Sequence, residues 1–470
     1  MRMFEMLGVT DALILVALLV GLVIISLFSN RKSKSSDDFN NGGKSLTLWV
    51  AVGSSIATFM GAYTGGGHCE LAFSSGMVAL TIIMGSNVGW IAQNALSRPL
   101  RTSGANTLAE FITKKYSATT RKIASFITVI YTLAALAGQF IAAGVLFEMI
   151  GIGSRTVGIT VAAFVIIVLT LVGGLKGVAV TNTIQTVFIV VVCVVVVPIL
   201  TFSKAGGVGF VMANTPPEKL GMLSNMPPLM ILGYFLASGL PFCAEPAIIQ
   251  RVISAKDPKT AFKSSVISNI LSLIMTIPIT LAVFTAPFIL PEITSGAQFY
   301  PGVIMNYLPV VIKGAALFAF MSLFLTTGDA YLHATSSNIV YDFIKPMDPD
   351  MDDKKLLNIS RILLVVIGLV GLVIALMGGS IYQVMLTGGA AFGAGLVPPI
   401  LFACFSKRKY NTKNVNAGML VGCLFTIIWD MSGMNGRTGM PGVVIGTILC
   451  VILCMINSKA PDQTAVAAAN

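Results

Sequence analysis

Charged side chains are scarce in this sequence of 470 residues: Asp, Glu, Lys and Arg make up 10% of it, whereas 55% is hydrophobic. A mean hydropathy of +0.88 is typical of a polytopic membrane protein rather than of a water-soluble core. The longest stretches between apolar segments, 97–122 and 203–227, are too short for a soluble catalytic or signalling domain. The function therefore resides in the membrane-spanning part.

Motifs of the usual enzyme classes are also missing. The seven cysteines lie mostly inside apolar runs and show neither the paired spacing of a zinc site nor a disulfide framework. No nucleophile, metal cluster or carboxylate pair occurs at a useful spacing, which argues against an enzyme and against a cofactor. The net charge of +11 does not indicate nucleic-acid binding, because the basic residues fall between apolar segments. No pattern indicates an obligate protein partner.

Apolar segments of about 17–25 residues, the length that crosses a bilayer, occur thirteen times. The predicted spans are 8–28, 46–68, 76–96, 123–149, 156–174, 177–202, 228–249, 264–290, 310–343, 360–377, 381–405, 414–432 and 438–457. With the N-terminus outside, 24 of the 30 Lys and Arg residues fall on the inner side, as the positive-inside rule requires. An odd number of spans then puts the C-terminus and a short tail (458–470) in the cytoplasm. We expect one all-α domain in the lipid bilayer of the cell membrane.

Two predicted spans carry helix-breaking residues near their middle. In the second span, "GAYTGGGHCE" (61–70) contains three consecutive glycines, each of which costs a helix about 1 kcal/mol relative to alanine. The seventh span contains "ASGLPFCAEP" (237–246), where Gly239, Pro241 and Pro246 weaken the helix. Unwound backbone at membrane depth is tolerated where protein or a wet cavity covers it. The alternative is that the glycines only allow close helix packing.

The two interrupted spans lie five spans apart, which is typical of transporters built from inverted repeats. Spans two to six (46–202) then form the first repeat, and spans seven to eleven (228–405) form the second. The first span (8–28) and the last two (414–457) are additions to this five-plus-five arrangement.

The ninth span concentrates polar side chains in "FLTTGDAYLHATSSNIVYDF" (324–343). Asp329 is a candidate functional residue, because placing an ionisable residue in a membrane span costs roughly 3 kcal/mol on insertion scales. The hydroxyls of Thr326 and Thr327, together with carbonyls freed by a broken helix, offer the oxygen ligands that sodium needs. Alternatively, these hydroxyls only bond to carbonyls one turn earlier in their own helix.

An acidic residue also follows the second interruption. Glu245, with Tyr63 and Phe242 at the two breaks, could hold an organic cation or an amine by charge and by cation–π attraction. The alternative is that Glu245 pairs with Arg251 near the inner surface and the rings only pack.

A series of motifs, in order along nearly the whole chain, resembles the sodium:solute symporter family, in the branch that includes the choline transporters. The motifs are "ATFMGAYTGGG", "TLAEFITKKY", "GQF", "GGLKGVAVTNTIQ", "EPAIIQR" and "TTGDAYL". The resemblance implies a leucine-transporter-type fold with a five-plus-five inverted repeat. It also implies a sodium site made by the backbone carbonyls of Thr58, Gly61 and Leu323 and the hydroxyls of Thr326 and Thr327. The implied solute-binding residues are Tyr63, Gln139, Phe140, Phe242 and Glu245.

Some positions depart from the family pattern. Met60 stands where many relatives have a polar or acidic residue, and Asn182 replaces the aspartate of the usual "TD..Q" pattern. Either change could weaken sodium coupling or remove an accessory cation site. The tryptophans that line the pocket of choline transporters are replaced here by Tyr63, Ile141 and Phe242. This replacement argues against choline itself.

The sequence thus predicts a secondary transporter that carries a small organic solute, cationic or zwitterionic, inward with sodium by alternating access. Asp329 and Asn182 are the predicted coupling or gating residues. A carrier of the same fold that uses protons through Asp329 or Glu245 is the first alternative, encouraged by Asn182 and Met60. A transporter-like membrane sensor is the second, and the lack of a signalling domain argues against it.

Overall fold

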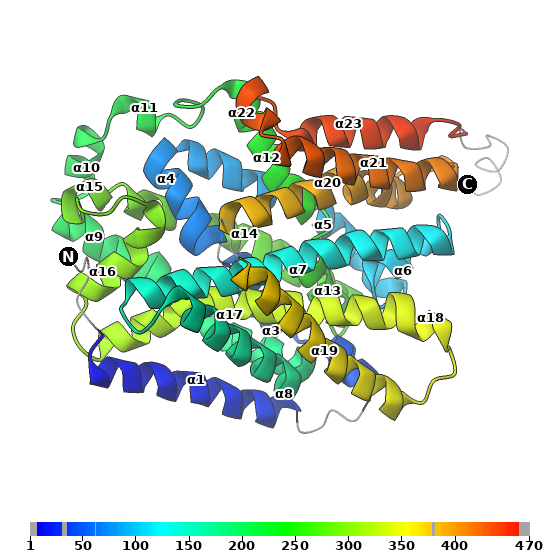
Figure 1. Cartoon of the computed structure of the whole chain (residues 1–470), viewed down its shortest axis with the longest axis horizontal. Coiled ribbons are helices and arrows are strands. Elements are labelled where there is room, and N and C mark those ends of the chain that lie inside the picture. Colours follow the sequence, from blue (N-terminus) through cyan, green and yellow to red (C-terminus); the bar gives the residue numbers. More distant parts are fainter. Residues whose placement is uncertain (1–6, 31–34, 62, 378–380, 460–470) are drawn as a thin grey trace.

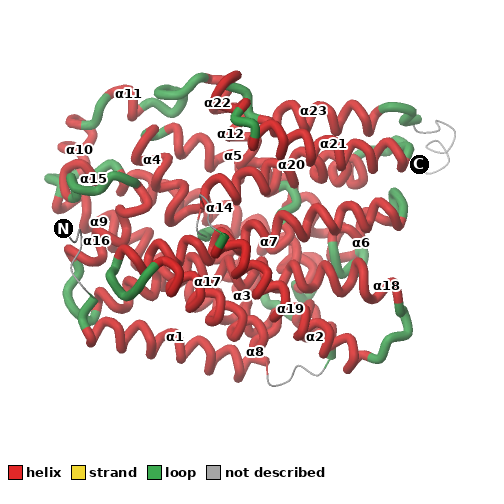
Figure 2. Tube along the Cα trace, in the orientation of Figure 1, coloured by secondary structure: helices red, strands yellow, loops and turns green. Residues whose placement is uncertain are grey.

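The computed structural model describes residues 7–30, 35–61, 63–377 and 381–459, without the side chains of Asn30, Tyr63 and 381–386. In these ranges the regular elements are helices, which run mostly along the long axis of the molecule (Figure 1). Figure 2 shows that the loops lie mostly at the two ends of this axis. Nine of the described helical segments are long and apolar enough to cross a membrane.

Within the described residues, each of the predicted spans falls mostly on helical residues. The longer helices are α1 (Val9–Asn30), α3 (Leu48–Phe59), α5 (Val78–Thr102), α7 (Ala118–Met149), α8 (Arg155–Ile189), α12 (Pro228–Phe242), α14 (Pro258–Val283), α17 (Ile312–Ile339), α19 (Asp353–Leu376), α20 (Ile381–Phe405), α21 (Thr412–Met431) and α23 (Gly442–Met455). The shorter ones are α2 (Ser36–Asn41), α4 (Cys69–Ser75), α6 (Leu108–Thr113), α9 (Val197–Lys204), α10 (Val208–Asn214), α11 (Pro217–Leu220), α13 (Pro246–Ser254), α15 (Ala286–Ile289), α16 (Phe299–Tyr307), α18 (Lys345–Met347) and α22 (Met434–Thr438). Segments of π-helix are η2 (Tyr63–His68), η3 (Val190–Val196) and η5 (Val340–Ile344), and 3₁₀ turns are η1 (Gly42–Lys44) and η4 (Gly296–Gln298).

Several long helices begin at a capping side chain. Ser117, Ser154 and Asp257 precede α7, α8 and α14, and each accepts a hydrogen bond from the backbone N–H three residues later. Such a cap contributes about 1 kcal/mol, because it satisfies a donor that the helix leaves free. The start of each of these helices is therefore set by local sequence as well as by burial.

Helix α8 contains the predicted span 156–174 and the first half of the next span, 177–202, which continues through η3 and α9; the two spans are separated near Gly174. This glycine has φ 51° and ψ −168°, a conformation that side-chain-bearing residues rarely adopt. Ile166 would touch a Cβ placed on Gly328 of α17, and Asn182 bonds to the next residue of α17, Asp329. Positions equally far before and after Gly174 thus reach the same level of α17, so the chain folds back at this glycine.

Both predicted interruptions are present. Helix α3 ends at Phe59, Met60 has φ −79° and ψ 44°, and the chain resumes helical form as η2, which leads into α4. The break therefore comes at Met60 and Gly61, before the run of three glycines. Helix α12 ends at Phe242 and α13 begins at Pro246, because proline cannot continue the helical hydrogen bonding.

Helix α17 occupies the centre of the bundle (Figure 1). In the most apolar 18-residue stretch of its span, 94% of the residues are buried. The corresponding share is 17% for α1 at the periphery. It packs against α7, α8, α1 and α3. The polar residues of α17 therefore face protein, not the surface of the molecule.

The loops that carry most of the basic residues meet at one end of the molecule. Lys44 donates to the carbonyl of Gly104 at 3.2 Å, and the Arg101 Nε donates to the carbonyl of Ala255 at 2.6 Å. Figure 1 shows α6 and α18 at this end, and α10, α15 and α16 at the opposite end. The charge asymmetry seen in the sequence is thus an asymmetry in space.

Candidate functional site

The first break faces the two adjacent threonines of α17. The Thr326 hydroxyl lies 3.0 Å from the carbonyl oxygen of Ala57 and 2.7 Å from that of Ser322, one turn earlier in α17, so bonding within its own helix is part of its environment but not all of it. The Thr327 hydroxyl lies 3.3 Å from the carbonyl oxygen of Ala57 and 3.1 Å from the carbonyl oxygen of Thr58. Carbonyls in the last turn of a helix have no donor within that helix, so both oxygens are open to an outside group. Two carbonyl and two hydroxyl oxygens therefore form a cluster at this point, which we call the oxygen cluster.

Close approach of α17 to the break depends on Gly61. A Cβ placed on Gly61 would lie 2.6 Å from Thr327 Oγ1, which is well inside van der Waals contact. Leu323, one turn before Thr327, is buried and its side chain packs against Gly65. Of the predicted sodium ligands, Thr58, Thr326 and Thr327 meet in the oxygen cluster and Gly61 adjoins it. Ala57 is a member that the sequence analysis missed.

Asp329 is linked to the oxygen cluster through Asn182. The Asn182 amide donates to Asp329 Oδ1 at 3.0 Å and to the carbonyl of Thr326 at 3.1 Å. Asp329 is fully buried, and its second carboxylate oxygen has no hydrogen-bond partner among the described residues. The two predicted coupling residues thus contact one another, and Asp329 lies two residues after Thr327 on α17.

The second break is held by a side chain of α5. The backbone N–H of Glu245 donates to the amide oxygen of Gln93 at 2.9 Å, which satisfies a donor freed by the break. The Glu245 carboxylate accepts a hydrogen bond from Tyr131 at 2.7 Å and is 1% exposed. Arg251 turns elsewhere, because it donates to Ser54 at 3.1 Å and to the carbonyl of Ala247 at 2.9 Å. The alternative of a pair between Glu245 and Arg251 is therefore wrong.

A cavity of about 90 Å³ lies between the two breaks, several times the roughly 10–15 Å³ that one water molecule needs. Helices α3, α5, α7, α12, α17 and α20 all contribute to its wall. The lining residues are Thr58, Phe59, Gly61, Ile83, Ser86, Tyr131, Ala237, Ser238, Pro241, Phe242, Thr327, Tyr331 and Gly389. The oxygen cluster and the cavity therefore share Thr58 and Thr327.

One wall of the cavity is aromatic. The rings of Phe59 and Phe242 meet edge to face with centroids 5.4 Å apart, and Trp90 packs behind both at 5.7 and 6.0 Å. The remaining wall carries hydroxyl groups, of which those of Ser86 and Ser238 lie 2.5 Å apart. Such a mixture of apolar surface and a few polar groups is typical of small-molecule sites.

The residues predicted to bind solute do not all reach this cavity. Phe242 lines it, and Glu245 lies behind Tyr131. Gln139 and Phe140 are fully buried but are not among the lining residues, and a Cβ on Gly371 of α19 would lie 3.2 Å from the Phe140 ring. The side chain of Tyr63 lies outside the described residues. Helix α7 instead contributes Tyr131, and α17 contributes Tyr331, neither of which the sequence analysis identified.

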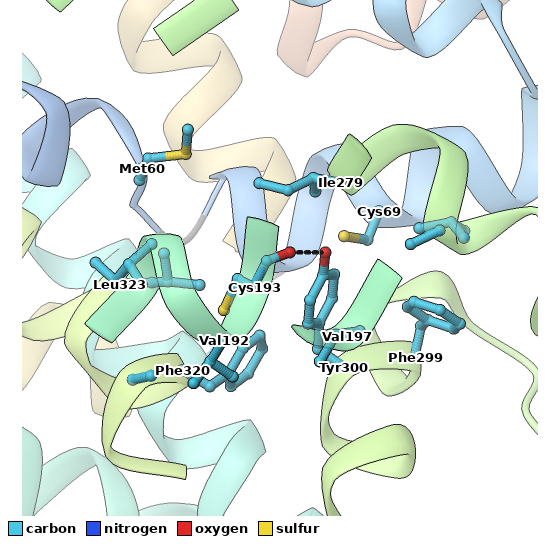
Figure 3. Close-up of a cluster of buried hydrophobic side chains, with 14 of the residues drawn as sticks. Met60, Cys69, Val192, Cys193, Val197, Ile279, Phe299, Tyr300, Phe320 and Leu323 are labelled. Atoms are coloured by element: carbon cyan, nitrogen blue, oxygen red, sulfur yellow. Dashed lines mark hydrogen bonds between the residues drawn. The ribbon is translucent and has the colours of Figure 1, made fainter. Parts of the chain in front are cut away.

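An apolar cluster fills the space between the first break and α16 (Figure 3). Met60 and Leu323 belong to this cluster, and Tyr300 reaches it from α16. The Tyr300 hydroxyl donates to the carbonyl of Cys193 in η3 at 2.8 Å, and its ring stacks on Phe320 with centroids 5.8 Å apart. Met60 is fully buried among apolar side chains.

The order of these elements, with two broken helices around a cavity, can be compared with known proteins. The sequence profile of the Sodium:solute symporter family matches residues 39–422, most of the chain. The chain belongs to this family. It is therefore a multi-pass membrane transporter that couples a small organic solute to sodium, and it is not an enzyme.

Curated relatives span nearly the same length. The high-affinity proline transporter PutP of Bacillus subtilis is 27% identical over 475 residues, covering 94% of this chain and 97% of the relative. The sodium/proline symporter of Escherichia coli is 25% identical over 466 residues, with coverage of 94% and 92%. Because these relatives are proline transporters, the predicted likeness to the choline-transporter branch is not confirmed.

Solved structures show the same fold. A Na⁺-coupled sialic acid symporter in a substrate-bound outward-open state superposes with a TM-score of 0.84 at 18% identity, covering 97% of this chain and 100% of the other. Mhp1, a nucleobase-cation-symport-1 family transporter in a closed conformation, gives 0.62 at 13% identity, with coverage of 89% and 93%. The leucine-transporter-type fold expected from the sequence is thereby confirmed.

Proposed function

We propose that the cavity between the breaks binds an amino acid with a small apolar body, with proline as the first candidate, and that sodium binds at the oxygen cluster. One observation carries this proposal: Thr58 and Thr327 belong both to the oxygen cluster and to the cavity wall. The relatives that transport proline supply the choice of solute.

The proposed sodium ligands are oxygen atoms of the first break and of α17. A sodium ion favours several oxygen ligands, and each threonine hydroxyl has two lone pairs that it can turn toward a cation. Binding would replace the hydrogen bonds that now join the hydroxyls to the carbonyls of Ala57 and Thr58. The ligand set is the carbonyls of Ala57, Thr58, Gly61 and Leu323 with the hydroxyls of Thr326 and Thr327.

Coupling follows from the shared wall. A ligand shifts a conformational equilibrium only by its different affinity for the two states. Sodium at the cluster orders Thr58 and Thr327, and so shapes the cavity that the solute enters. By linkage, the solute must raise the affinity for sodium by the same factor. Release of sodium to the interior, where its concentration is low, then frees the solute.

The cavity chemistry suits a zwitterion with an apolar body. Phe59 and Phe242 offer the apolar surface, and the hydroxyls of Ser86 and Ser238 offer polar contacts. No Lys or Arg is among the lining residues that the structure describes. A bound carboxylate would therefore depend on sodium for its positive partner, which favours joint binding of the two.

Uptake by purified protein in liposomes tests the proposal. Proline uptake should require an inward sodium gradient, and Thr327→Val should lower sodium affinity by roughly 10- to 100-fold, because it removes one ligand. The matched control is Thr335→Val, the same change two turns along α17, where the hydroxyl bonds to Tyr331 O and Thr132 instead. It should change sodium affinity less than about threefold. Equal uptake in sodium and choline buffers at fixed pH would show that sodium does not drive the uptake.

Proton coupling is the second candidate, favoured by one observation. The buried carboxylates of Asp329 and Glu245 each have an oxygen without a partner among the described residues, which is a site where a proton could reside. Uptake driven by a pH gradient in sodium-free buffer, and lost in Asp329→Asn, would support it. Uptake that ignores the pH gradient would exclude it.

We further propose that the end carrying α6 and α18 faces the cytoplasm, with the C-terminus on that side and the N-terminus outside. The gathering of basic loops at this end supports the orientation. Lys407 is exposed there, so a cysteine placed at this position should react with an impermeant thiol reagent only after the cells are permeabilised. Reaction in intact cells would reverse the orientation.

A further inference from the structure

Two tyrosine hydroxyls meet at the cavity wall in front of a buried carboxylate. Tyr131 of α7 and Tyr331 of α17 both line the cavity, and their hydroxyl oxygens lie 3.3 Å apart. Tyr131 also lies 2.7 Å from Glu245 Oε2. Glu245 itself does not line the cavity. Two of these side chains come from helices far apart in the sequence and the third comes from the second break, so their meeting is a feature of the tertiary fold.

The carboxylate sets the direction of this chain of hydrogen bonds. An ionised carboxylate can only accept, so the Tyr131 proton points at Glu245. The contact between the two tyrosines must then have Tyr331 as its donor. Both phenol protons are then used within this chain of hydrogen bonds, so the two cavity-lining residues have oxygen lone pairs to offer and no free O–H. The wall formed by Tyr131 and Tyr331 therefore accepts hydrogen bonds and offers none.

The negative charge behind this wall has no cation of its own. Among the described residues neither Lys nor Arg forms an ion pair with Glu245, and Arg251 is engaged by Ser54 and Ala247. A buried unpaired charge is costly. A positive group that enters the cavity would offset that cost, and it would do so from the side where the acceptors lie.

We propose that Tyr131 and Tyr331 recognise an ammonium group that bears N–H bonds, and that Glu245 acts as the positioning residue that holds both phenols as acceptors. The inference rests on the proposed function, because it assigns one end of the amino acid in the same cavity. A positive charge is not sufficient for this recognition, because the solute must also present N–H donors to the two phenol oxygens. Quaternary amines are therefore rejected although they carry the same charge.

Three ligands that share a five-membered ring and a carboxylate separate the contributions. Proline has the charge and two N–H donors, proline betaine has the charge without N–H, and tetrahydrofuran-2-carboxylate has neither. A site built to hydrogen-bond a group strongly rejects an analogue that lacks it. In sodium buffer, the wild-type protein should bind proline at least about 100-fold more tightly than either analogue, measured by thermal stabilisation and by competition with proline uptake.

Variants then test the assigned residues. Tyr131→Phe and Glu245→Gln should each reduce the preference for proline over the two analogues by about tenfold or more, because proline loses affinity and the analogues do not. Tyr116→Phe is the matched control, since its hydroxyl bonds to the carbonyl of Pro399 away from the cavity, and it should leave the preference unchanged. A preference is a ratio of affinities, so a general loss of stability does not move it. Should Tyr131→Phe fail to fold, Glu245→Gln and Tyr331→Phe provide the same readout.

The outcomes separate this inference from the proposed function. Sodium-dependent binding of proline with equal binding of proline betaine retains the proposed function and overturns the inference in favour of recognition by charge alone. An unchanged preference in both Tyr131→Phe and Glu245→Gln also overturns it. If another amino acid binds in place of proline, the same comparison is made with that amino acid and its betaine. If no ammonium-bearing solute binds, the inference is wrong.

Discussion

The two helix breaks differ in what their backbone offers to a ligand. At the first break the carbonyls of Ala57 and Thr58 are met by hydroxyls of α17, groups that a cation can displace. At the second break the freed N–H of Glu245 is already satisfied by Gln93, and the adjoining surface is the ring of Phe242 against Phe59.

This difference indicates that the two breaks bind different ligands. A hard cation needs several oxygen acceptors close together, which the first break supplies. An organic solute needs apolar surface and a few fixed polar groups, which the second break supplies. Changes at the first break should therefore act on sodium, and changes at the second should act on the solute or on stability.

The largest effect is expected from Gly61→Ala at the first break. The added Cβ would lie 2.6 Å from Thr327 Oγ1, so α17 and the break must move apart and the oxygen cluster opens. Overpacking of this kind costs about 1–3 kcal/mol, so sodium affinity should fall by up to roughly 100-fold. Sodium-dependent thermal stabilisation and the sodium dependence of uptake measure it.

Gly66→Ala is the matched control for Gly61→Ala. It adds the same methyl group to the same broken segment, but a Cβ at Gly66 meets nothing within 4 Å. Its effect on sodium affinity should stay within about threefold. An equal loss of sodium affinity in both variants would mean that the broken segment requires the backbone conformations of glycine. It would contradict the proposal that sodium binding depends on the close contact between Gly61 and Thr327.

A smaller effect is expected from Gln93→Leu at the second break. It leaves the N–H of Glu245 without an acceptor, which costs about 1–3 kcal/mol. The melting temperature and the solute affinity should both fall, whereas sodium affinity measured without solute should not change.

Gln185→Leu is the control for Gln93→Leu. It makes the same change at a fully buried glutamine whose amide atoms have no partner among the described residues, so it should leave the melting temperature unchanged or raise it. A reversed order of the two melting temperatures contradicts this account of the second break.

Much of this arrangement could be predicted from residue patterns. The apolar segments gave the helices, and the glycines and prolines gave both breaks, because these effects depend on local chemistry. Thr326 and Thr327 stood out because hydroxyls beside an acidic residue are unusual in a span. Ala57 could not be found in this way, because any residue has a carbonyl and its availability depends on where α3 ends.

The solute side was harder to predict for a geometric reason. Gln139 and Phe140 were expected at the cavity, but Tyr131, about two turns earlier on α7, is the residue that lines it. Eight residues move a side chain about 12 Å along a helix while leaving it on a similar face. Periodicity therefore identifies the face of a helix, and tertiary packing decides which level of that face meets the cavity.

The smallest effect is expected from Asn182→Ala, which acts on the first break only indirectly. It removes the donor to Asp329 Oδ1 and to the carbonyl of Thr326, but it removes none of the proposed sodium ligands. Asp329 then has a buried oxygen atom left without a partner, so sodium affinity should fall about fivefold and stability should fall by about 1–2 kcal/mol.

The neighbouring residue supplies the control for Asn182→Ala. The Thr181 hydroxyl bonds only to carbonyls of its own helix, those of Gly177 and Val178, so Thr181→Ala should leave sodium affinity unchanged. If Asn182→Ala lowers stability without touching sodium affinity, Asp329 supports the fold and has no part in coupling. If sodium affinity falls in Asn182→Ala but not in Thr181→Ala, Asp329 affects sodium binding at the first break through Asn182 and Thr326, although Asp329 does not itself contact that break.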